Sequence, residues 1–148
     1  MGGSRALGCE LRRAFRSEVS ARGAAQVLAV VERVDLRVRT KQFALRMIRL
    51  YCALPKRTEV EVIGKQVLRS GTSVGANFRE AYRARSDAEF VSKLGDCLKE
   101  LEEMSYWLEL LVEGEIVPAD RLAALQEECN QLIAILTTIS KKVKYRTK

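Results

Sequence analysis

The chain has 148 residues, which is long enough for one domain with a single hydrophobic core. Hydrophobic residues at 47% and charged residues at 30% are values of a globular protein. A net charge of +7 favours an acidic partner such as nucleic acid or an anionic surface, although a soluble protein can also simply be basic. The sequence contains no run of 18 apolar residues and no signal-peptide core, so neither a membrane span nor secretion is predicted.

Charge is unevenly distributed along the chain. Residues 41–85 carry ten Lys or Arg and three Asp or Glu, whereas residues 86–120 carry two and ten. A basic segment followed by an acidic one predicts contact between the two, within one chain or between copies, as much as contact with a ligand.

The four cysteines are Cys9, Cys52, Cys97 and Cys129, and no histidine is present. Because no pair has C-x-x-C spacing and no histidine is available, we expect neither a zinc site built from Cys and His nor a cofactor. Cys97 and Cys129 fall on apolar positions, which predicts buried reduced thiols and a cytoplasmic protein. Without histidine, a serine such as Ser73 has no base to activate it, so we expect no enzymatic activity.

Residues 1–34 show no sustained period and are predicted to be an N-terminal extension, flexible or partly helical. The domain is predicted over residues 35–146. Its first helix starts at Leu36 and stops before Pro55, which cannot continue a helix. Apolar positions spaced 4-3-4-3-4 form its inner face: Leu36, Thr40, Phe43, Met47, Leu50 and Leu54.

A second helix is predicted from Thr58 to about Ala84. Thr58 and Glu61 have the spacing of a capping box, in which each side chain accepts a hydrogen bond from a free backbone N–H. Gly71 and Gly75, four residues apart, predict a close approach of a neighbouring helix. The inner face comprises Ile63, Val67, Ser70, Val74, Phe78 and Ala81. The opposite face carries a basic ridge, formed by Lys65, Arg69, Arg79 and Arg83 with Arg85 at its end.

Two further helices follow. Ser86 and Glu89 form a second capping-box pattern at the start of the third helix, and Gly114 follows its end as a C-terminal cap. Pro118 suits the first turn of the fourth helix. The inner stripes are Phe90, Leu94, Cys97, Leu101, Met104, Leu108 and Leu111 on the third, and Leu122, Leu125, Cys129, Leu132, Leu136, Ile139 and Val143 on the fourth.

Four helices with 3-4 spacing and short connections predict an all-α, antiparallel up-down-up-down four-helix bundle with left-handed packing. Several apolar residues lie outside the inner stripes, namely Val91, Leu98, Trp107, Val112, Ile133 and Ile135. They favour self-association, and the alternative is a wider core stripe.

The second helix carries a family resemblance, in the runs Gln66–Ser70 and Thr72–Asn77 followed by Glu80. The Leu54–Lys56 turn and Ser86–Phe90 support it. On these residues, the chain from about Asp35 to Arg146 resembles the four-helix-bundle family encoded in intervening sequences of bacterial 23S ribosomal RNA genes. The family usually has an Asn-Ile-Ala-Glu-Gly run, and here Arg79 and Ala81 replace its alanine and glycine.

The resemblance implies a bundle that assembles into a ring, expected to be a pentamer, with no established enzymatic activity. Some relatives resemble accessory proteins of diversity-generating retroelements, in which a basic bundle ring partners a reverse transcriptase and its RNA. The expectation for this chain is binding to nucleic acid, RNA or DNA with RNA favoured, and the alternative is an adaptor role beside a reverse transcriptase. We expect no sequence specificity, because the sequence has no groove-reading motif and no set of stacking aromatic residues.

Basic side chains suitable for phosphate contacts form three groups. The candidate nucleic-acid-binding residues are Arg39, Arg46 and Arg49 on the first helix, Lys65, Arg69, Arg79, Arg83 and Arg85 on the second, and Lys141, Lys142, Lys144 and Arg146 near the chain's end. The alternative is a solvated face, or ion pairs to the acidic third helix.

Two sets of polar residues are predicted to have structural roles. Ser73, Asn77 and Glu80 are predicted to form a buried network that fixes the helix register. Glu89, Asp96, Glu100 and Glu103 share one face of the third helix, and we expect them to meet a basic ridge rather than to bind a metal, because no histidine can complete such a site.

Overall fold

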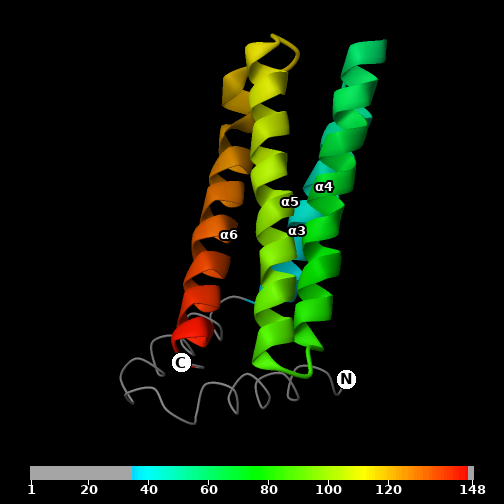
Figure 1. The fold of residues 1–148 in the computed structure, drawn as a ribbon. Helices are drawn as coiled ribbons and strands as arrows, with labels where there is room; N and C mark the ends of the chain where they lie inside the picture. The colour runs from blue at the N-terminus through cyan, green and yellow to red at the C-terminus, as the bar shows by residue number, and fades with distance from the viewer. Residues whose placement is uncertain (1–34, 147–148) are drawn as a thin grey trace.

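The computed structural model describes residues 35–146, and within them the chain forms four α-helices. They are α3 (Leu36–Ala53), α4 (Thr58–Tyr82), α5 (Asp87–Glu113) and α6 (Ala119–Arg146). Each helix runs antiparallel to the one before it, with α3 against α4, α4 against α5 and α5 against α6 (Figure 1). The all-α bundle is therefore confirmed, whereas the proposed extension over residues 1–34 lies outside the described part.

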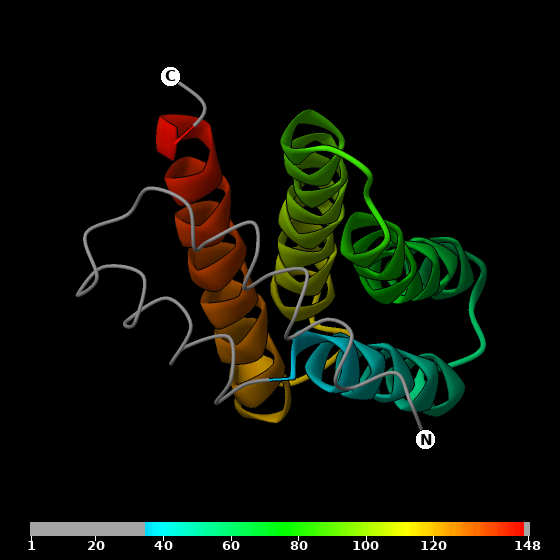
Figure 2. The same cartoon turned by 90° about the horizontal axis from the view of Figure 1, so that it is seen from below.

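Seen from below, α6, α5, α4 and α3 follow one another around the bundle (Figure 2). Polar side chains also join α3 to α6, since Arg39 on α3 donates to both carboxylate oxygens of Glu128 on α6 at 2.6 and 2.8 Å. No helix in the described range is both long and apolar enough to cross a membrane.

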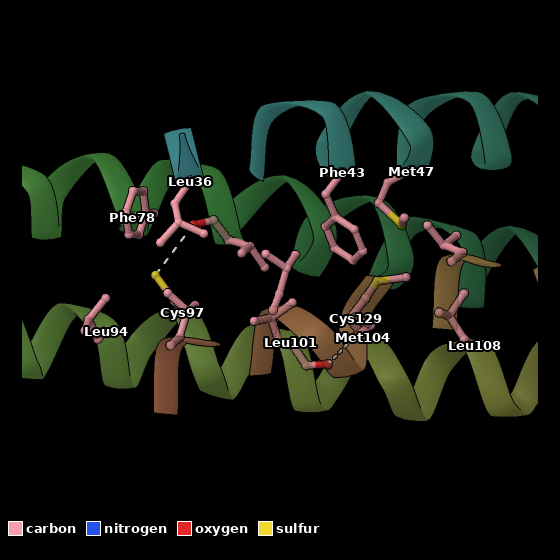
Figure 3. Packing of buried hydrophobic residues seen from close by; sticks show 14 of the residues in the cluster. Leu36, Phe43, Met47, Phe78, Leu94, Cys97, Leu101, Met104, Leu108 and Cys129 are labelled. Carbon is pink, nitrogen blue, oxygen red and sulfur yellow. Dashed lines mark hydrogen bonds between the residues drawn. The ribbon is translucent and has the colours of Figure 1, made fainter. Parts of the chain in front are cut away.

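The core follows the predicted inner stripes closely. Every predicted residue of α6 is buried, and so is every one of α5 except Phe90, which is half-buried. Figure 3 shows part of this core, including Leu101 and Met104 of α5 and Cys129 of α6. On α3 and α4 the exceptions are Leu50, Leu54 and Ile63, which are also half-buried but still pack against the core. The 3-4 spacing thus identified which side of each helix faces inward.

The two core thiols are buried, as the sequence predicts. Cys97 Sγ donates to the carbonyl of Val74 at 3.6 Å, and Cys129 Sγ donates to that of Leu101 at 3.2 Å (Figure 3). Burial disfavours the thiolate and raises the pKa of each thiol to about 12. Both are therefore chemically inert parts of the core.

Glycine allows α3 and α4 to approach closely. A Cβ on Gly71 would lie 2.1 Å from Met47 Cγ, and one on Gly75 would lie 3.5 Å from the Thr40 carbonyl oxygen. Met47 is fully buried, so it has little room to move away. The predicted close approach is confirmed, and it is tightest at Gly71.

The helix ends differ in part from their sequence signals. The Thr58 capping box is wrong, because Thr58 is already the first helical residue and Arg57 precedes it without a side-chain cap. Ser86 does cap α5, since its Oγ accepts from the Glu89 N–H at 3.1 Å. The Glu89 carboxylate accepts from the Arg85 N–H at 2.8 Å, one residue before the position that a capping box requires.

In the turn after α5, the residue with a positive φ is not the predicted cap Gly114 but the next residue, Glu115. Gly114 caps the helix with an ordinary φ of −75°, whereas Glu115 has the positive φ of 56°. Gly114 is needed for space, because a Cβ there would lie 2.7 Å from the Leu110 carbonyl oxygen. Pro118 immediately precedes α6 instead of lying inside its first turn.

The apolar residues outside the predicted stripes pack at the margin of the core. Val91, Leu98, Trp107, Val112, Ile133 and Ile135 are all half-buried against it. A wider core stripe accounts for their burial. Self-association stays a prediction, and the large apolar side chains still exposed in the described helices are Val38, Ile48, Val62, Tyr106 and Tyr145.

Candidate nucleic-acid interface

We call the four cations on the outer face of α4 and at its end the basic ridge, namely Lys65, Arg69, Arg79 and Arg83. All four side chains are exposed. They lie on one helical stripe with Thr72 and Ala76, opposite the buried face that contains Val67, Val74 and Phe78. The four cations share this stripe, but they have different partners in the structure.

Arg69 is tied to the acidic face of α5. Its guanidinium donates to both oxygens of Glu100 at 3.3 Å and makes a short contact with Glu103. Trp107 Nε1 donates to the same Glu103 carboxylate at 3.2 Å. The hydrogen bond from Arg69 is the main reason why the pKa of Glu103 lies below its usual value, and the same bond raises the pKa of Arg69. The basic and acidic segments thus meet within one chain, at the α4–α5 contact.

Two other candidate cations also join helices. Arg39 on α3 binds Glu128 and donates to Gln131 Oε1 at 2.6 Å, and its hydrogen bond to Glu128 raises the Arg39 pKa. Arg146 at the end of α6 donates to Asp87 at the start of α5 at 2.6 Å, and only 13% of its side chain is exposed. These two arginines therefore form ion pairs between helices of the bundle.

The remaining candidates divide further by their partners. Lys65 lies 3.8 Å from Glu61 on its own helix, and Lys144 has an interaction of its own. Among residues 35–146, no acidic side chain forms an ion pair with the other seven. Those seven are Arg46, Arg49, Arg79, Arg83, Arg85, Lys141 and Lys142.

Four cations gather at one hollow, between the start of α3 and the end of α4. The hollow has a volume of about 300 Å³. Arg79 and Arg83 contribute from α4, and Arg37 and Lys41 contribute from α3, with Asp35, Val38 and Tyr82 completing the lining. Arg37 places its Cζ 4.4 Å from the centre of the Tyr82 ring, a cation–π contact.

Arg37 and Lys41 were not among the residues expected to bind nucleic acid. They are four residues apart on α3, so the sequence does place them on one helical face. Their importance depends on the crossing of α3 over α4 near Gly75, which brings them to Arg79 and Arg83. The helical period of either segment alone does not contain that information.

The predicted buried network does not form. Ser73 Oγ donates to the Arg69 carbonyl of its own helix at 2.7 Å, and the exposed Glu80 pairs with Lys93 on α5 at 2.5 Å. Asn77 is half-buried and makes no hydrogen bond through its side chain to the described residues. The fully buried hydroxyls of this region are Thr40, which donates to the Leu36 carbonyl at 2.7 Å, and Ser70. The register prediction therefore named the wrong residues, because Ser70 and not Ser73 faces inward.

The carboxylates of α5 form no metal-binding arrangement in the part of the chain that the structure describes. No group of three or more His, Cys, Asp or Glu side chains converges there. Glu100 and Glu103 bind Arg69, and Asp96 lies 4.0 Å from Lys93. The acidic face thus meets basic side chains instead.

Comparisons with known proteins agree with this bundle. The family model for 23S rRNA-intervening sequence proteins matches residues 32–138. The chain is similar to a protein of unknown function from the S23 ribosomal protein family of Bacteroides thetaiotaomicron, whose crystal structure was determined at 1.70 Å resolution. The two are 39% identical with a TM-score of 0.67, over 71% of this chain and 94% of the other. A comparison with curated proteins finds no match.

Proposed function

Since the chain belongs to the family of 23S rRNA-intervening sequence proteins, we propose that it is a non-catalytic, homo-oligomeric bundle that binds nucleic acid through exposed Arg and Lys side chains. The similar protein of known structure is itself of unknown function, so the proposal rests on the surface of this chain. Its setting is the cytoplasm, where reduced thiols such as Cys97 and Cys129 are usual.

The observation that carries the proposal is that seven of the predicted binding residues form no ion pair with the described residues. Carboxylates on α5 and α6 neutralise Arg69, Arg39 and Arg146, but Arg79, Arg83 and the other five stay available. A phosphate backbone is the partner that many separate cations fit, because each contact releases counterions and adds affinity. Guanidinium groups also match phosphate oxygens in a bidentate manner.

The surface favours binding without sequence specificity. The exposed cations lie on the helices of one bundle or in the connection between α4 and α5, and none of these helices projects from the bundle as a groove-reading element does. In a ring of identical subunits, weak contacts made by each copy would combine into strong binding through avidity. We therefore propose the homo-oligomer, expected to be a pentamer, as part of the function.

The salt dependence of binding tests this function. Binding to labelled RNA and DNA, followed by fluorescence anisotropy, should weaken more than about tenfold between about 50 and 200 mM salt if at least three phosphates are neutralised. Absence of binding at low salt would refute the proposal. Native mass spectrometry reports the assembly in the same buffer, and a monomer would remove the avidity component.

A triple charge-reversal variant changes one residue of each basic group and combines Arg49→Glu, Arg79→Glu and Lys141→Glu. These side chains are exposed and outside the ion pairs described above, so the bundle should keep its helicity while RNA binding is lost. Arg69→Glu is unsuitable for this purpose. It would place a third carboxylate beside Glu100 and Glu103 and disturb the α4–α5 contact.

The second candidate function is an adaptor that recruits a protein, such as the reverse transcriptase of a retroelement. Exposed apolar side chains favour it, since Ile48, Val62 and Tyr106 are between 43% and 59% exposed. An adaptor would bind its protein partner equally well at low and moderate salt and would not need the seven cations. Retained partner binding by the triple charge-reversal variant would therefore favour this function.

A further inference from the structure

Positive charge exceeds negative charge in the lining of the hollow between α3 and α4. Four cations line it with one carboxylate, Asp35. Asp35 caps α3, accepting from the backbone N–H groups of Arg37 and Val38 at 3.0 and 3.3 Å. It lies 3.6 Å from Arg37 Nε, which is too far for a hydrogen bond. Most of the positive charge in the hollow is thus not neutralised by the described residues.

Arg37 is held in place before any ligand arrives. Its guanidinium packs on the Tyr82 ring, and its side chain is only 27% exposed. A side chain that is already ordered loses little conformational freedom on binding. The flat guanidinium also offers a surface on which a nucleobase can stack.

The size of the hollow limits what can enter it. Its volume of about 300 Å³ is at the lower end of the range for small-molecule pockets, about 300–1,000 Å³. A duplex keeps its bases paired inside, so it could only lay its backbone across the rim. An unpaired nucleotide can turn its base inward while its phosphate stays among the cations.

We propose that this hollow binds one unpaired nucleotide of a single-stranded nucleic acid. Its phosphate lies between Lys41 of α3 and Arg79 and Arg83 at the end of α4, and its base packs against Arg37. This inference rests on the proposed function and adds to it a preference for single strands and a defined site.

Arg79 and Arg83 also have a purely structural explanation. They lie at the C-terminal end of α4, where the helix dipole is negative and cations are stabilising. Under that explanation, their removal would lower the melting temperature without changing nucleic-acid binding. The two explanations therefore predict different measurements on the same variants.

The first measurement compares strand states. The full-length protein is titrated into a labelled, unstructured single-stranded RNA and into the duplex formed with its complement, at one low salt concentration. The single strand should bind about tenfold more tightly, the lower part of the range for one stacked base. Equal or tighter binding of the duplex would overturn the inference, and failure to bind either would refute the proposed function as well.

The second measurement compares two variants of equal charge. In Arg79→Ala/Arg83→Ala, the slope of log affinity against log salt for the single strand should fall by about 0.7, the value for the one phosphate that both arginines contact. Its preference for single strands should also disappear. The control Lys141→Ala/Lys142→Ala removes the same charge from α6, which does not line the hollow, and should keep the preference.

Equal effects of the two variants would assign binding to general charge and overturn the site. A lower melting temperature of Arg79→Ala/Arg83→Ala with unchanged RNA binding would assign these arginines to the end of α4 and also overturn it. Arg79→Ala alone should already reduce the preference, because Arg79 is one of the cations that line the hollow.

Discussion

At the scale of single residues, two helical glycines of the bundle have opposite roles. A Cβ on Gly71 would lie 2.1 Å from Met47 Cγ and 3.1 Å from Met47 Cβ, whereas a Cβ on Gly95 would meet nothing within 4 Å. Alanine is the better helix former at both positions, by about 1 kcal/mol. The difference between the two sites therefore comes from packing.

Gly71→Ala should lower the free energy of unfolding by about 1–3 kcal/mol, because Met47 is fully buried and the helices must separate to admit the methyl group. Gly95→Ala should instead raise it by up to about 1 kcal/mol. Urea unfolding followed by circular dichroism measures both. Stabilisation by Gly71→Ala would contradict the close approach of α3 and α4.

Arg69 shows how a surface cation becomes part of the fold. Its hydrogen bond holds the pKa of Glu103 below the usual value for glutamate. The pair therefore contributes its full stability when the pH is above the pKa of Glu103 in the unfolded chain. The contribution is lost as the pH falls and Glu103 becomes protonated. Since the Arg69 side chain is 49% exposed, the energy is that of a surface pair, about 1 kcal/mol or less.

Arg69→Met should therefore destabilise the protein by up to about 1 kcal/mol at pH 7 and by much less at pH 3. Urea unfolding at the two pH values measures this difference. Lys65→Met is the control, because Lys65 and Glu61 are 3.8 Å apart and both exposed, and it should change little at either pH. A loss for Arg69→Met that is the same at both pH values would show that the packing of its methylene groups matters instead.

At the scale of helices, two identical sequence signals have different outcomes. Thr58 to Glu61 and Ser86 to Glu89 both have the spacing of a capping box. Only Ser86 accepts a backbone N–H, since α4 starts at Thr58 itself. The position of the first helical residue depends on the turn after Pro55, and the spacing pattern does not contain it.

Ser86→Ala should therefore cost about 1 kcal/mol, the usual value for a lost N-cap. Thr58→Ala should cost less than half of this, because its side chain caps nothing. Thermal unfolding of the two variants under identical conditions gives the comparison. Equal losses would restore the capping role that the sequence suggests for Thr58.

The elements themselves could be predicted well because each depends on local spacing. The inner stripes, the stop before Pro55 and the start of α5 at Ser86 all follow from residues within a few positions of one another. The charge pattern predicted that the basic segment would meet the acidic face of α5, but it could not predict which individual residues pair across the bundle. Whether Arg69 meets Glu103, or Arg79 meets Lys41 at a hollow, depends on the register between helices that are separate in sequence.

At the scale of the whole molecule, one core extends through all four helices and includes two thiols. Cys97 on α5 and Cys129 on α6 are fully buried, and burial raises the pKa of each to about 12. In the unfolded chain both thiols ionise near pH 8.5. Between these values the unfolded state loses protons that the folded state keeps, so the stability of the bundle falls as the pH rises.

Each thiol should contribute up to about 1.4 kcal/mol of lost stability per pH unit in this range. Lysine and tyrosine side chains also titrate there, so the test compares the parent chain with Cys97→Ala/Cys129→Ala, in which those contributions cancel. The variant is less stable at pH 7, because it loses two packed side chains, but its stability should decline less steeply from pH 9 to 11. Urea unfolding at several pH values gives both slopes, and equal slopes would mean that the thiols ionise as readily in the folded core as in the unfolded chain.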